Sequence, residues 1–486
     1  GRVTRINAPI DEANPSGRSV DFKDEGRDFE ITDPRIITTT RRNNAIGQLR
    51  SVVDPSPGGT TSYAYRPFGE LTSITDAASN VTSWSYNLRG FVIGTSDPDA
   101  GSWVYEANAF GETERIRDAK TAAPNWTAQF TYDKLARPLT RVEPEGTTTW
   151  TWGNSAAAKN IGQLASIASP GSYSEAYTFD SLGRLSQQTV TADATTYNIN
   201  LTYHAQTGLL DTLQYPTSTS SYRLKLAYDY SNNRLQKVRD FNGSTIFWQA
   251  TSTDAYGHIQ NEAFGNGVLT FTDFDQASGL MSAREGGIGG GAGLINAQVA
   301  WDPDGNLTRR KDLQQSPNIT EDIVYDNLNR FDSSQRTVGT GIPATNQDVT
   351  LDAIGNINWK LGVGNYAYHA TKKRAVVNAG GLSFGYDANG NMNTRNGSSI
   401  GYTSYNLPNV INAGSSSSTL SYGAFRNRYK QVSSGSIAET TIYVAGLLEK
   451  VTRGSVTEYR HLIAGGKGIA TIYTRRSDAT NSTYYV

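Results

Sequence analysis

Few residues in this chain have the chemistry of an active site. The 486 residues contain no cysteine and four histidines, which are His204, His258, His369 and His461. A histidine-based site needs acidic, nucleophilic or metal partners that converge on the ring in space. The first three histidines occupy slots of a repeated motif described below, which explains them without chemistry. We therefore expect no catalytic, cofactor-binding or metal-binding residue in this chain.

One segment has the beginning of a calcium loop. Asp302-Pro-Asp304-Gly305-Asn306 places oxygen-bearing side chains two residues apart. A calcium-binding EF-hand loop also needs glycine at its sixth position and glutamate at its twelfth. Those positions hold Leu307 and Leu313. The segment is therefore interpreted as a turn, and no metal is expected.

A glycine-rich run, Gly286–Gly293, has the composition of a phosphate-binding loop. Such a loop is followed by Lys-Ser or Lys-Thr and lies between a strand and a helix. Neither condition holds for this run, which predicts a long hairpin loop instead.

The bulk composition excludes several classes of partner. Lysine and arginine number 44 against 45 acidic residues, so that the net charge is −1. Net charge this close to zero does not attract nucleic acid or anionic membranes. No apolar run is long enough to span a bilayer, and the first twenty residues lack the apolar core of a signal peptide. We therefore expect that the chain begins in mid-protein or is exported by a route that this segment does not encode.

The abundance of tyrosine, glycine, threonine and serine favours an all-β fold with frequent turns. A short motif recurs: an aromatic residue, usually Asp, two variable residues, Gly, a polar residue and an aliphatic one. Clear copies are Phe179–Leu185, Trp301–Leu307 and Tyr386–Met392. The period of about 21 to 26 residues is typical of repeat architectures. The marker position is held by Gly47, Gly69, Gly90, Gly111, Ala136, Gly162, Gly183, Gly208, Asn233, Gly257, Gly279, Gly305, Asn329, Gly355 and Gly390. A degenerate copy is expected around Tyr366–Tyr368.

Residues before each marker alternate as they do in a strand, for example Trp84 with Tyr86 and Phe130 with Tyr132. Asp accepts backbone hydrogen bonds in turns, and Gly adopts positive φ without steric cost. Each repeat is therefore predicted to be strand, tight turn with a bulge, strand. The residues expected to form these repeats are Tyr65, Gly69, Tyr86, Gly90, Tyr132, Asp133, Phe179, Asp180, Gly183, Trp301, Asp302, Gly305, Tyr325, Asp326, Asp352, Gly355, Tyr386, Asp387 and Gly390.

Two other repeat folds have similar features. A parallel β-helix has coils of this length but does not need a hairpin signature at each bend. A propeller needs blades of about 40 residues. The pattern favours antiparallel hairpins joined into one long coiling sheet. Two charged runs, Arg309–Asp312 and Lys372–Arg374, are either solvated strand ends or a patch that contacts a cargo.

The motif series resembles the YD repeat of the Rhs family, which includes bacterial Rhs toxins, the C components of Tc toxins and teneurins. The resemblance extends from about Gly47 onward. Near the end of the chain, Tyr422–Arg428, Tyr443–Lys450 and Glu458–His461 resemble the segment that precedes the Rhs core. The resemblance implies a spiralling antiparallel sheet that forms part of a hollow shell, a β-cocoon. It also implies that the core, its cleavage carboxylates and the toxin follow Thr483–Val486.

The expected organisation has three parts: an irregular lead-in (1–42), the YD-repeat shell (43–410) and terminal repeats before an absent core (411–486). The expected function is a non-enzymatic shell segment that encapsulates a C-terminal toxic domain for delivery. An alternative is a teneurin-like or wall-associated protein that binds cells or glycans, and an enzyme would need clustered carboxylates. Expected partners are the enclosed toxin domain, the downstream core of the same precursor and a secretion or delivery apparatus, with glycans as a further candidate. The implied location is secreted or on the bacterial cell surface.

Overall fold

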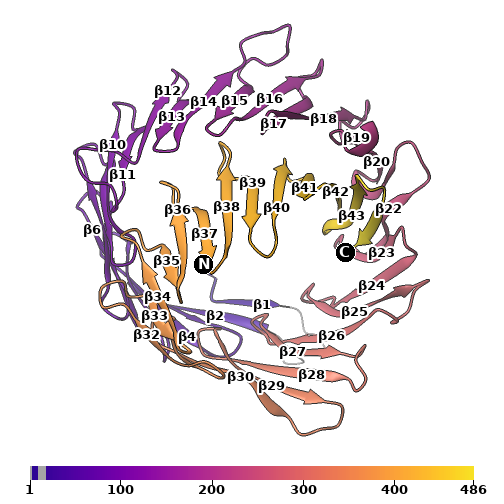
Figure 1. Ribbon diagram of the computed structural model, residues 1–486. Helices are drawn as coiled ribbons and strands as arrows, with labels where there is room; N and C mark the ends of the chain where they lie inside the picture. Colours follow the sequence, from indigo (N-terminus) through magenta and orange to yellow (C-terminus); the bar gives the residue numbers. More distant parts are fainter. Residues whose placement is uncertain (1–2, 9–17) are drawn as a thin grey trace. The chain divides into compact units, whose positions relative to one another are not determined.

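The computed structural model describes residues 3–8 and 18–486, which form a 44-stranded antiparallel sheet (Figure 1). The strands of the first half are β1 Arg5–Ala8, β2 Arg18–Glu25, β3 Asp28–Thr32, β4 Thr38–Asn43, β5 Leu49–Val53, β6 Thr60–Tyr65, β7 Leu71–Thr75, β8 Val81–Tyr86, β9 Val92–Asp97, β10 Gly101–Ala107, β11 Thr113–Arg117, β12 Ala128–Tyr132, β13 Pro138–Glu143, β14 Gly146–Trp152, β15 Leu164–Ser169, β16 Tyr173–Phe179, β17 Leu185–Ala192, β18 Thr195–Tyr203, β19 Leu210–Gln214, β20 Lys225–Ser231, β21 Arg234–Asp240 and β22 Ile246–Thr253. One helical turn, η1 Thr219–Ser221, lies between β19 and β20.

The remaining strands continue the same alternation of strand and turn. They are β23 Ile259–Phe264, β24 Val268–Phe274, β25 Met281–Ile288, β26 Ile295–Trp301, β27 Leu307–Asp312, β28 Ile319–Tyr325, β29 Phe331–Val338, β30 Ala344–Leu351, β31 Ile357–Lys360, β32 Gly364–Tyr368, β33 Val376–Ala379, β34 Leu382–Tyr386, β35 Met392–Arg395, β36 Ser398–Tyr402, β37 Pro408–Ala413, β38 Ser416–Tyr422, β39 Arg428–Ser434, β40 Glu439–Val444, β41 Leu448–Arg453, β42 Val456–Gly465, β43 Gly468–Arg476 and β44 Ser482–Tyr485.

Each motif closes a hairpin between consecutive antiparallel strands. In the β16–β17 hairpin, Thr178 pairs with Gln187 and Phe179 pairs with Leu185, so the register shifts between Thr178 and Phe179. The same one-residue shift occurs at the motif end of β6–β7, β8–β9, β12–β13, β26–β27 and β28–β29. This shift is the bulge expected where a left-handed residue ends a tight turn. The predicted strand, turn and strand of the repeat are confirmed, as is the all-β class.

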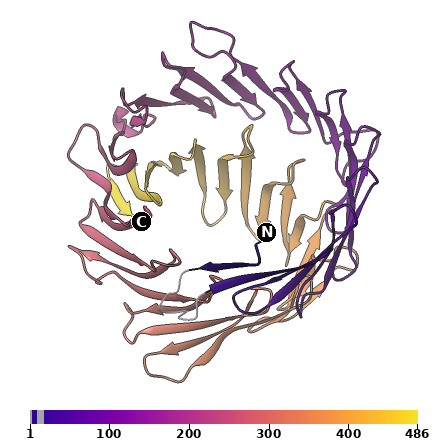
Figure 2. The same cartoon turned by 180° about the vertical axis from the view of Figure 1, so that it is seen from behind.

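The chain divides into two compact units, and each combines two stretches before residue 269 with one later stretch. Unit 1 comprises residues 1–105, 118–120 and 269–392, and unit 2 comprises residues 106–117, 121–268 and 393–486. In each unit we call the stretches before residue 269 the first strip and the later stretch the second strip. In unit 1, indigo strands of the first strip and orange strands of the second strip lie in the same region of Figure 2, and turns of the two strips are in contact.

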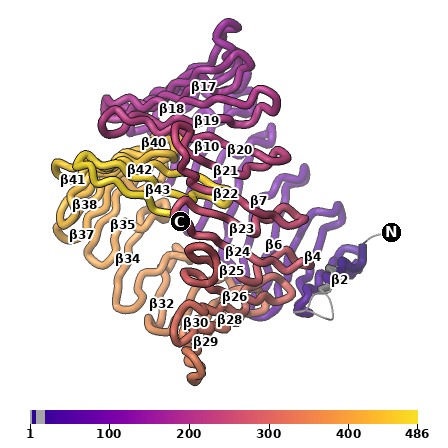
Figure 3. The backbone as a smooth tube through the Cα atoms, turned by 90° about the vertical axis from the view of Figure 1, so that its right-hand side faces the viewer, coloured from indigo at the N-terminus to yellow at the C-terminus, as the bar shows by residue number. Residues whose placement is uncertain are grey.

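Unit 2 holds the larger buried core of the described residues. Leu226, Val238 and Trp248 of the first strip pack with Val444 and Ile463 of the second, all at most 1% exposed. Strand β22 contacts β42 and β43, which lie beside it in Figures 1 and 3. The core forms because two amphipathic sheets cover one another's apolar faces.

The N-terminal segment is more regular than expected. Residues 18–42 of the predicted irregular lead-in belong to β2, β3, β4 and the turns between them, and these strands pair antiparallel. The sequence lacked the aromatic-Asp-Gly phrase there, and a turn at Asp33–Ile37 uses Ile36 at φ 67° in place of glycine. Residues 1–2 and 9–17 of that lead-in lie outside the described residues. The boundaries at 43 and 410 remain predictions.

Candidate functional site: motif turns and the seams between strips

The repeating unit of the site is the turn at Asp180. The Gly183 N–H donates to the Asp180 carbonyl over 3.0 Å, which closes the turn. The Asp180 carboxylate Oδ1 accepts the N–H groups of Leu182 and Arg184, each at 2.9 Å. Its Oδ2 accepts Nε of Arg184 at 2.7 Å. Asp therefore binds the backbone ahead of it, which is why the motif requires this residue type.

The polar residue after the marker connects one repeat to the next. The guanidinium of Arg184 stacks 4.5 Å from the centroid of the Tyr203 ring in the following repeat. Arg137 makes the same contact with Trp152 at 4.8 Å. The Tyr203 hydroxyl in turn donates to the Leu185 carbonyl at 2.8 Å. Sequence reasoning identified this slot only as polar and missed its linking role.

The motif aromatics also link repeats, because their polar tips donate to a carbonyl in the preceding repeat. The pairs are Tyr65 with Leu49, Tyr86 with Leu71, Tyr132 with Thr113, Trp152 with Pro138, Trp301 with Met281, Tyr325 with Leu307, Tyr368 with Ile357, Tyr386 with Val376 and Tyr422 with Pro408. Tyr368 thereby belongs to the degenerate copy expected around Tyr366–Tyr368. Phe179 has no donor and lies half-buried at the same position.

Every marker residue named from the sequence has positive φ. The values are 104° for Gly69, 82° for Gly90, 77° for Gly183, 86° for Gly305, 89° for Gly355 and 86° for Gly390. The non-glycine markers Ala136, Asn233 and Asn329 also adopt it, at 61°, 60° and 58°. The carboxylates of Asp133, Asp302, Asp326, Asp352 and Asp387 all accept turn N–H groups as Asp180 does.

Three of the motif carboxylates, Asp133, Asp180 and Asp326, have pKa values below the ordinary value. The backbone N–H of Arg184 lowers the pKa of Asp180, and the Arg184 side chain adds to this effect. The Arg137 side chain lowers the pKa of Asp133 in the same way. Burial raises the pKa of Asp326, but hydrogen bonds from Arg330 outweigh it and the net shift is downward. These turn bonds are therefore charge-assisted at neutral pH.

The two strips of unit 1 meet at a seam of turns. Arg374, in a motif turn of the second strip, contacts Asp76 at 3.0 Å and Asp99 at 3.2 Å in turns of the first strip. Arg35 of the first strip pairs with Asp304 at 2.7 Å. The run Lys372–Arg374 is thus neither a solvated loop tip nor a free patch, since it binds the neighbouring strip.

Unit 2 has a seam of the same kind. Ser404 donates its N–H to Glu145 at 2.7 Å, and Lys430 pairs with Asp193 at 2.5 Å. The Tyr429 hydroxyl donates to the Gly171 carbonyl at 3.0 Å. In each strip the motif turns lie along one edge, which we call the motif edge. The turns between successive motifs, which we call return turns, lie along the opposite edge, the return edge. In both units, motif turns of the second strip contact return turns of the first strip.

The seam of unit 2 ends at a tight hairpin contact. Lys467 pairs at 3.1 Å with Glu262, whose other oxygen accepts Nε1 of Trp248 at 2.9 Å. Gly466 lies against the Trp248 ring so closely that an added Cβ would be 2.3 Å from Ile259 and 2.8 Å from Trp248. Only glycine fits at this position. The sequence showed the Gly465-Gly466 pair but not what it faces.

The histidines take structural positions. The N–H groups of Thr371 and Lys372 donate to Nδ1 of His369, which replaces the turn Asp. His258 contacts Asp254 at 2.8 Å within its turn. His461 is fully buried in unit 2, and its Nδ1 lies 2.9 Å from the Tyr473 carbonyl. Burial lowers the pKa of His461 to about 4.

The other candidate segments are also accounted for. Oδ1 of Asp302 accepts the N–H groups of Asp304 and Asn306, and Asp304 pairs with Arg35, so these oxygens already have protein partners. Gly289, Gly290 and Gly291 form the hairpin loop between β25 and β26. No group of three metal-ligating side chains occurs among residues 3–8 and 18–486. No helix in that part of the chain could cross a membrane.

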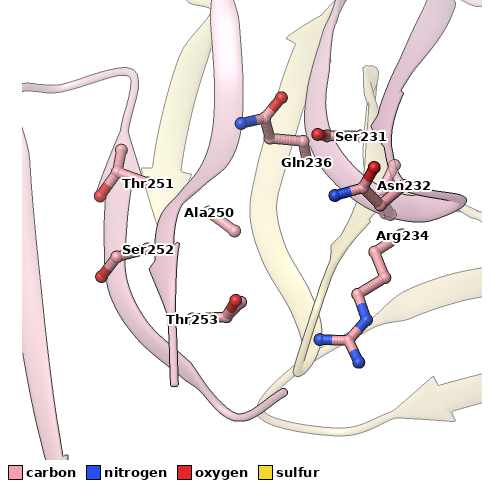
Figure 4. Close-up of a pocket in the computed structure, with 9 residues that line it drawn as sticks. Ser231, Asn232, Arg234, Gln236, Ala250, Thr251, Ser252 and Thr253 are labelled. Carbon is pink, nitrogen blue, oxygen red and sulfur yellow. The ribbon is translucent and has the colours of Figure 1, made fainter. Parts of the chain in front are cut away.

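A pocket of about 440 Å³ lies beside the bulge of β22 in unit 2 (Figure 4). Ser231, Asn232, Thr251 and Ser252 line it, and their side chains do not converge on one point. Its one cation, Arg234, reaches toward Gly257 of the next motif turn. Arg234 therefore occupies the linking slot of the repeat, and the pocket lacks the convergent polar groups of a ligand site.

Comparisons with known proteins agree with this geometry. The RHS Repeat family model matches residues 67–102. No curated protein sequence matches the chain. The family model confirms the resemblance of the motif series to the Rhs and YD-repeat family at residues 67–102. The similarity of the fold to solved structures confirms it over nearly the whole chain.

The fold matches solved Tc toxin structures over nearly the whole chain. A crystal structure of TcdB2-TccC3-TEV gives a TM-score of 0.74 at 14% identity and covers 99% of this chain. A structure of TcdB2-TccC3 without its hypervariable C-terminal region gives 0.73 at 15% identity and covers 98%. A Tc holotoxin pore of Photorhabdus luminescens gives 0.66 at 15% identity and covers 96%. This chain spans 28%, 28% and 26% of those chains, respectively.

Proposed function

We propose, from a repeat fold of the Rhs and Tc toxin kind, that this chain is a non-catalytic wall segment of a bacterial toxin shell that encloses a C-terminal toxic domain for delivery. One observation supports the proposal most: within each unit the second strip seats its motif turns on the return turns of the first. Turns that are seated on turns close the gap between neighbouring strips, which is what a continuous wall requires.

The chemistry of the turns fits a wall better than an active site. The motif carboxylates bind backbone N–H groups and neighbouring cations, and these contacts stabilise the turns. A general acid or base needs a carboxyl group that a substrate can reach. The proposed function therefore depends on the space that the wall would enclose. The chain would act by separating the toxic domain from the cell that produces it. One matched relative is named for a hypervariable C-terminal region, and a variable cargo is proposed here by analogy.

Protease protection tests the proposal. The natural polypeptide that contains these residues is purified and treated with a protease of broad specificity. A stretch outside residues 1–486 that resists cleavage until the shell is unfolded by urea supports enclosure. Cleavage of all such stretches at the same low urea concentration contradicts it. A cell-wall anchor in the gene, without a variable domain or a neighbouring immunity gene, favours the adhesion alternative.

A further inference from the structure

Unit 2 has a fully buried histidine where its two strips meet. His461 lies on β42 of the second strip and is 0% exposed. The ring of Tyr215, from the first strip, lies 5.3 Å from the histidine ring at an angle of 70°. The ring of Tyr473, which is paired with His461 on β43, lies 5.7 Å from it. His461 therefore contacts both strips.

Only one ring nitrogen of His461 has a hydrogen-bond partner in the described part of the chain. Nδ1 lies 2.9 Å from the Tyr473 carbonyl, which only accepts, so Nδ1 carries the proton of the neutral ring. Nε2 is buried and has no partner among residues 3–8 and 18–486. Protonation would place a second N–H group at Nε2, where the protein supplies no acceptor.

The groups around the ring do not favour its charged form. The titratable and charged side chains on the elements packed around it are Lys450 of β41, Tyr459 of β42, Tyr473 and Arg475 of β43, Tyr215 and Tyr222 between β19 and β20, and Asp240 at the end of β21. Asp240 influences Tyr222, whereas the charge that acts on His461 is the positive charge of Arg475.

Other charged residues of β41 and β42 lie on the opposite face of these strands. Glu458 and Arg460 alternate with the inward-facing residues of β42 and form an ion pair. Glu449, opposite Arg460 on β41, also pairs with it. Burial therefore lowers the pKa of His461, and Arg475 lowers it further.

Hydrogen bonds that hold the second strip on the first lie beside the histidine. The Tyr215 hydroxyl donates to the carbonyl of Leu462 at 2.8 Å. Oγ1 of Thr471, on β43, donates to the carbonyl of Phe247 at 3.1 Å. Both bonds join a side chain of one strip to the backbone of the other. The strips can therefore separate here without breaking the ladder between β42 and β43.

We propose that His461 is an acid-sensitive switch in unit 2, which keeps β42 and β43 on the first strip at neutral pH and releases them when its ring is protonated. The neutral ring fits the buried site because it needs only the Tyr473 carbonyl. The charged ring needs a further acceptor, which water supplies once the strips part. The inference concerns unit 2 alone and is independent of what the wall encloses.

The two protonation equilibria set the size of the effect. The pKa of His461 is about 4 in the closed seam, and a histidine in water has a pKa of about 6.5. The open seam therefore binds the proton first, so acidification through this window favours opening. The ratio of open to closed seam should rise roughly 50- to 100-fold from about pH 7.5 to about pH 4.5.

Thiol labelling can measure the opening, because the chain has no cysteine of its own. Val444→Cys places a thiol at a fully buried position of the second strip, in the core that the two strips share. Ala128→Cys is the matched control, at a buried position of unit 2 outside that core. The labelling rate with dithiodipyridine, a reagent active at acidic pH, is measured across this pH range. Each rate is divided by that of the urea-unfolded chain at the same pH.

The relative labelling rate of Val444→Cys should rise roughly 50- to 100-fold on acidification, and that of Ala128→Cys should stay nearly constant. Adding His461→Gln to Val444→Cys should abolish the rise. Adding Tyr215→Phe instead removes the hydrogen bond to Leu462 and keeps the ring. It should raise the labelling rate by about the same factor at every pH and leave the pH dependence in place.

Three results would overturn the proposal. The labelling of Val444→Cys could be independent of pH. The rise could persist in the presence of His461→Gln, which would assign the proton to another group. Ala128→Cys could show the same rise, which would mean that unit 2 unfolds as a whole. The first and third results need no substitution at His461, so the test holds even where that variant does not fold.

Discussion

The guanidinium of Arg184 stacks on Tyr203 of the following repeat, with its carbon 4.5 Å from the ring centroid. The same guanidinium holds the carboxylate of Asp180 in its own turn. One side chain therefore completes a turn and connects it to the next repeat. Contacts between adjacent repeats therefore contribute to the stability of this protein, as they do in other repeat proteins.

Arg184→Ala should lower the free energy of unfolding by about 1 kcal/mol, since it removes a partly exposed cation–π contact and a charge-assisted bond. Urea denaturation measures the change. Arg309→Ala is the matched control, because Arg309 forms an exposed ion pair with Asp322 and such pairs contribute about 0 to 1 kcal/mol. Equal losses for both variants would show that the contact with Tyr203 adds nothing.

Substitutions at Gly183 should separate backbone strain from crowding. An added Cβ there has 3.5 Å to its nearest neighbour, so space is not limiting. Gly183→Asn should cost little, since Asn233 and Asn329 hold the same slot at positive φ. Gly183→Val should cost about 1 to 2 kcal/mol more, because β-branched residues resist the left-handed region. Circular dichroism during thermal unfolding checks the order, and equal stability of the two variants would refute the turn assignment.

Gly466→Ala should destabilise unit 2 by crowding alone. The new methyl group would lie 2.3 Å from Ile259 and 2.8 Å from Trp248, and overpacking of this kind costs about 1 to 3 kcal/mol. Gly293→Ala is the control, since a Cβ there meets nothing within 4 Å. Tryptophan fluorescence in a urea series measures the loss of stability. Unchanged stability of Gly466→Ala would mean that the hairpin does not lie on this ring.

Stability should fall as the pH drops from about 6.5 toward 4. Burial lowers the pKa of His461 to about 4, whereas the unfolded chain titrates near 6.5. The unfolded state therefore binds the proton first, and acidification through this window favours unfolding. The lowered pKa values of Asp133, Asp180 and Asp326 mean that these three carboxylates lose their stabilising contribution only at still lower pH. Urea midpoints measured at successive pH values test this.

His461→Gln is the variant that isolates the effect, because it keeps polarity and removes the titration. Its stability should depend less on pH between about 4 and 6.5 than that of the wild type. His204→Gln is the control, since it replaces an exposed histidine by the same residue type. A wild-type slope that persists in His461→Gln would assign the titration to other groups.

The repeat itself is determined by the sequence. Asp180 and Gly183 define a turn through local rules of hydrogen bonding and φ, which act within about five residues and need no tertiary information. The alternation that ends at Phe179 defines a strand for the same reason. Where the local signal was atypical, as at Ile36, the prediction of an irregular segment was wrong.

The tertiary structure alone decided which repeats meet and which turn side chains are exposed. Arg374 contacts Asp76 and Asp99 across nearly three hundred residues, and no periodicity within one repeat encodes that distance. It depends on how far successive hairpins twist before one strip reaches another, a quantity summed over many strands. For that reason the sequence could identify Leu182 as a turn residue, but only the tertiary structure shows that its side chain is exposed among the described residues.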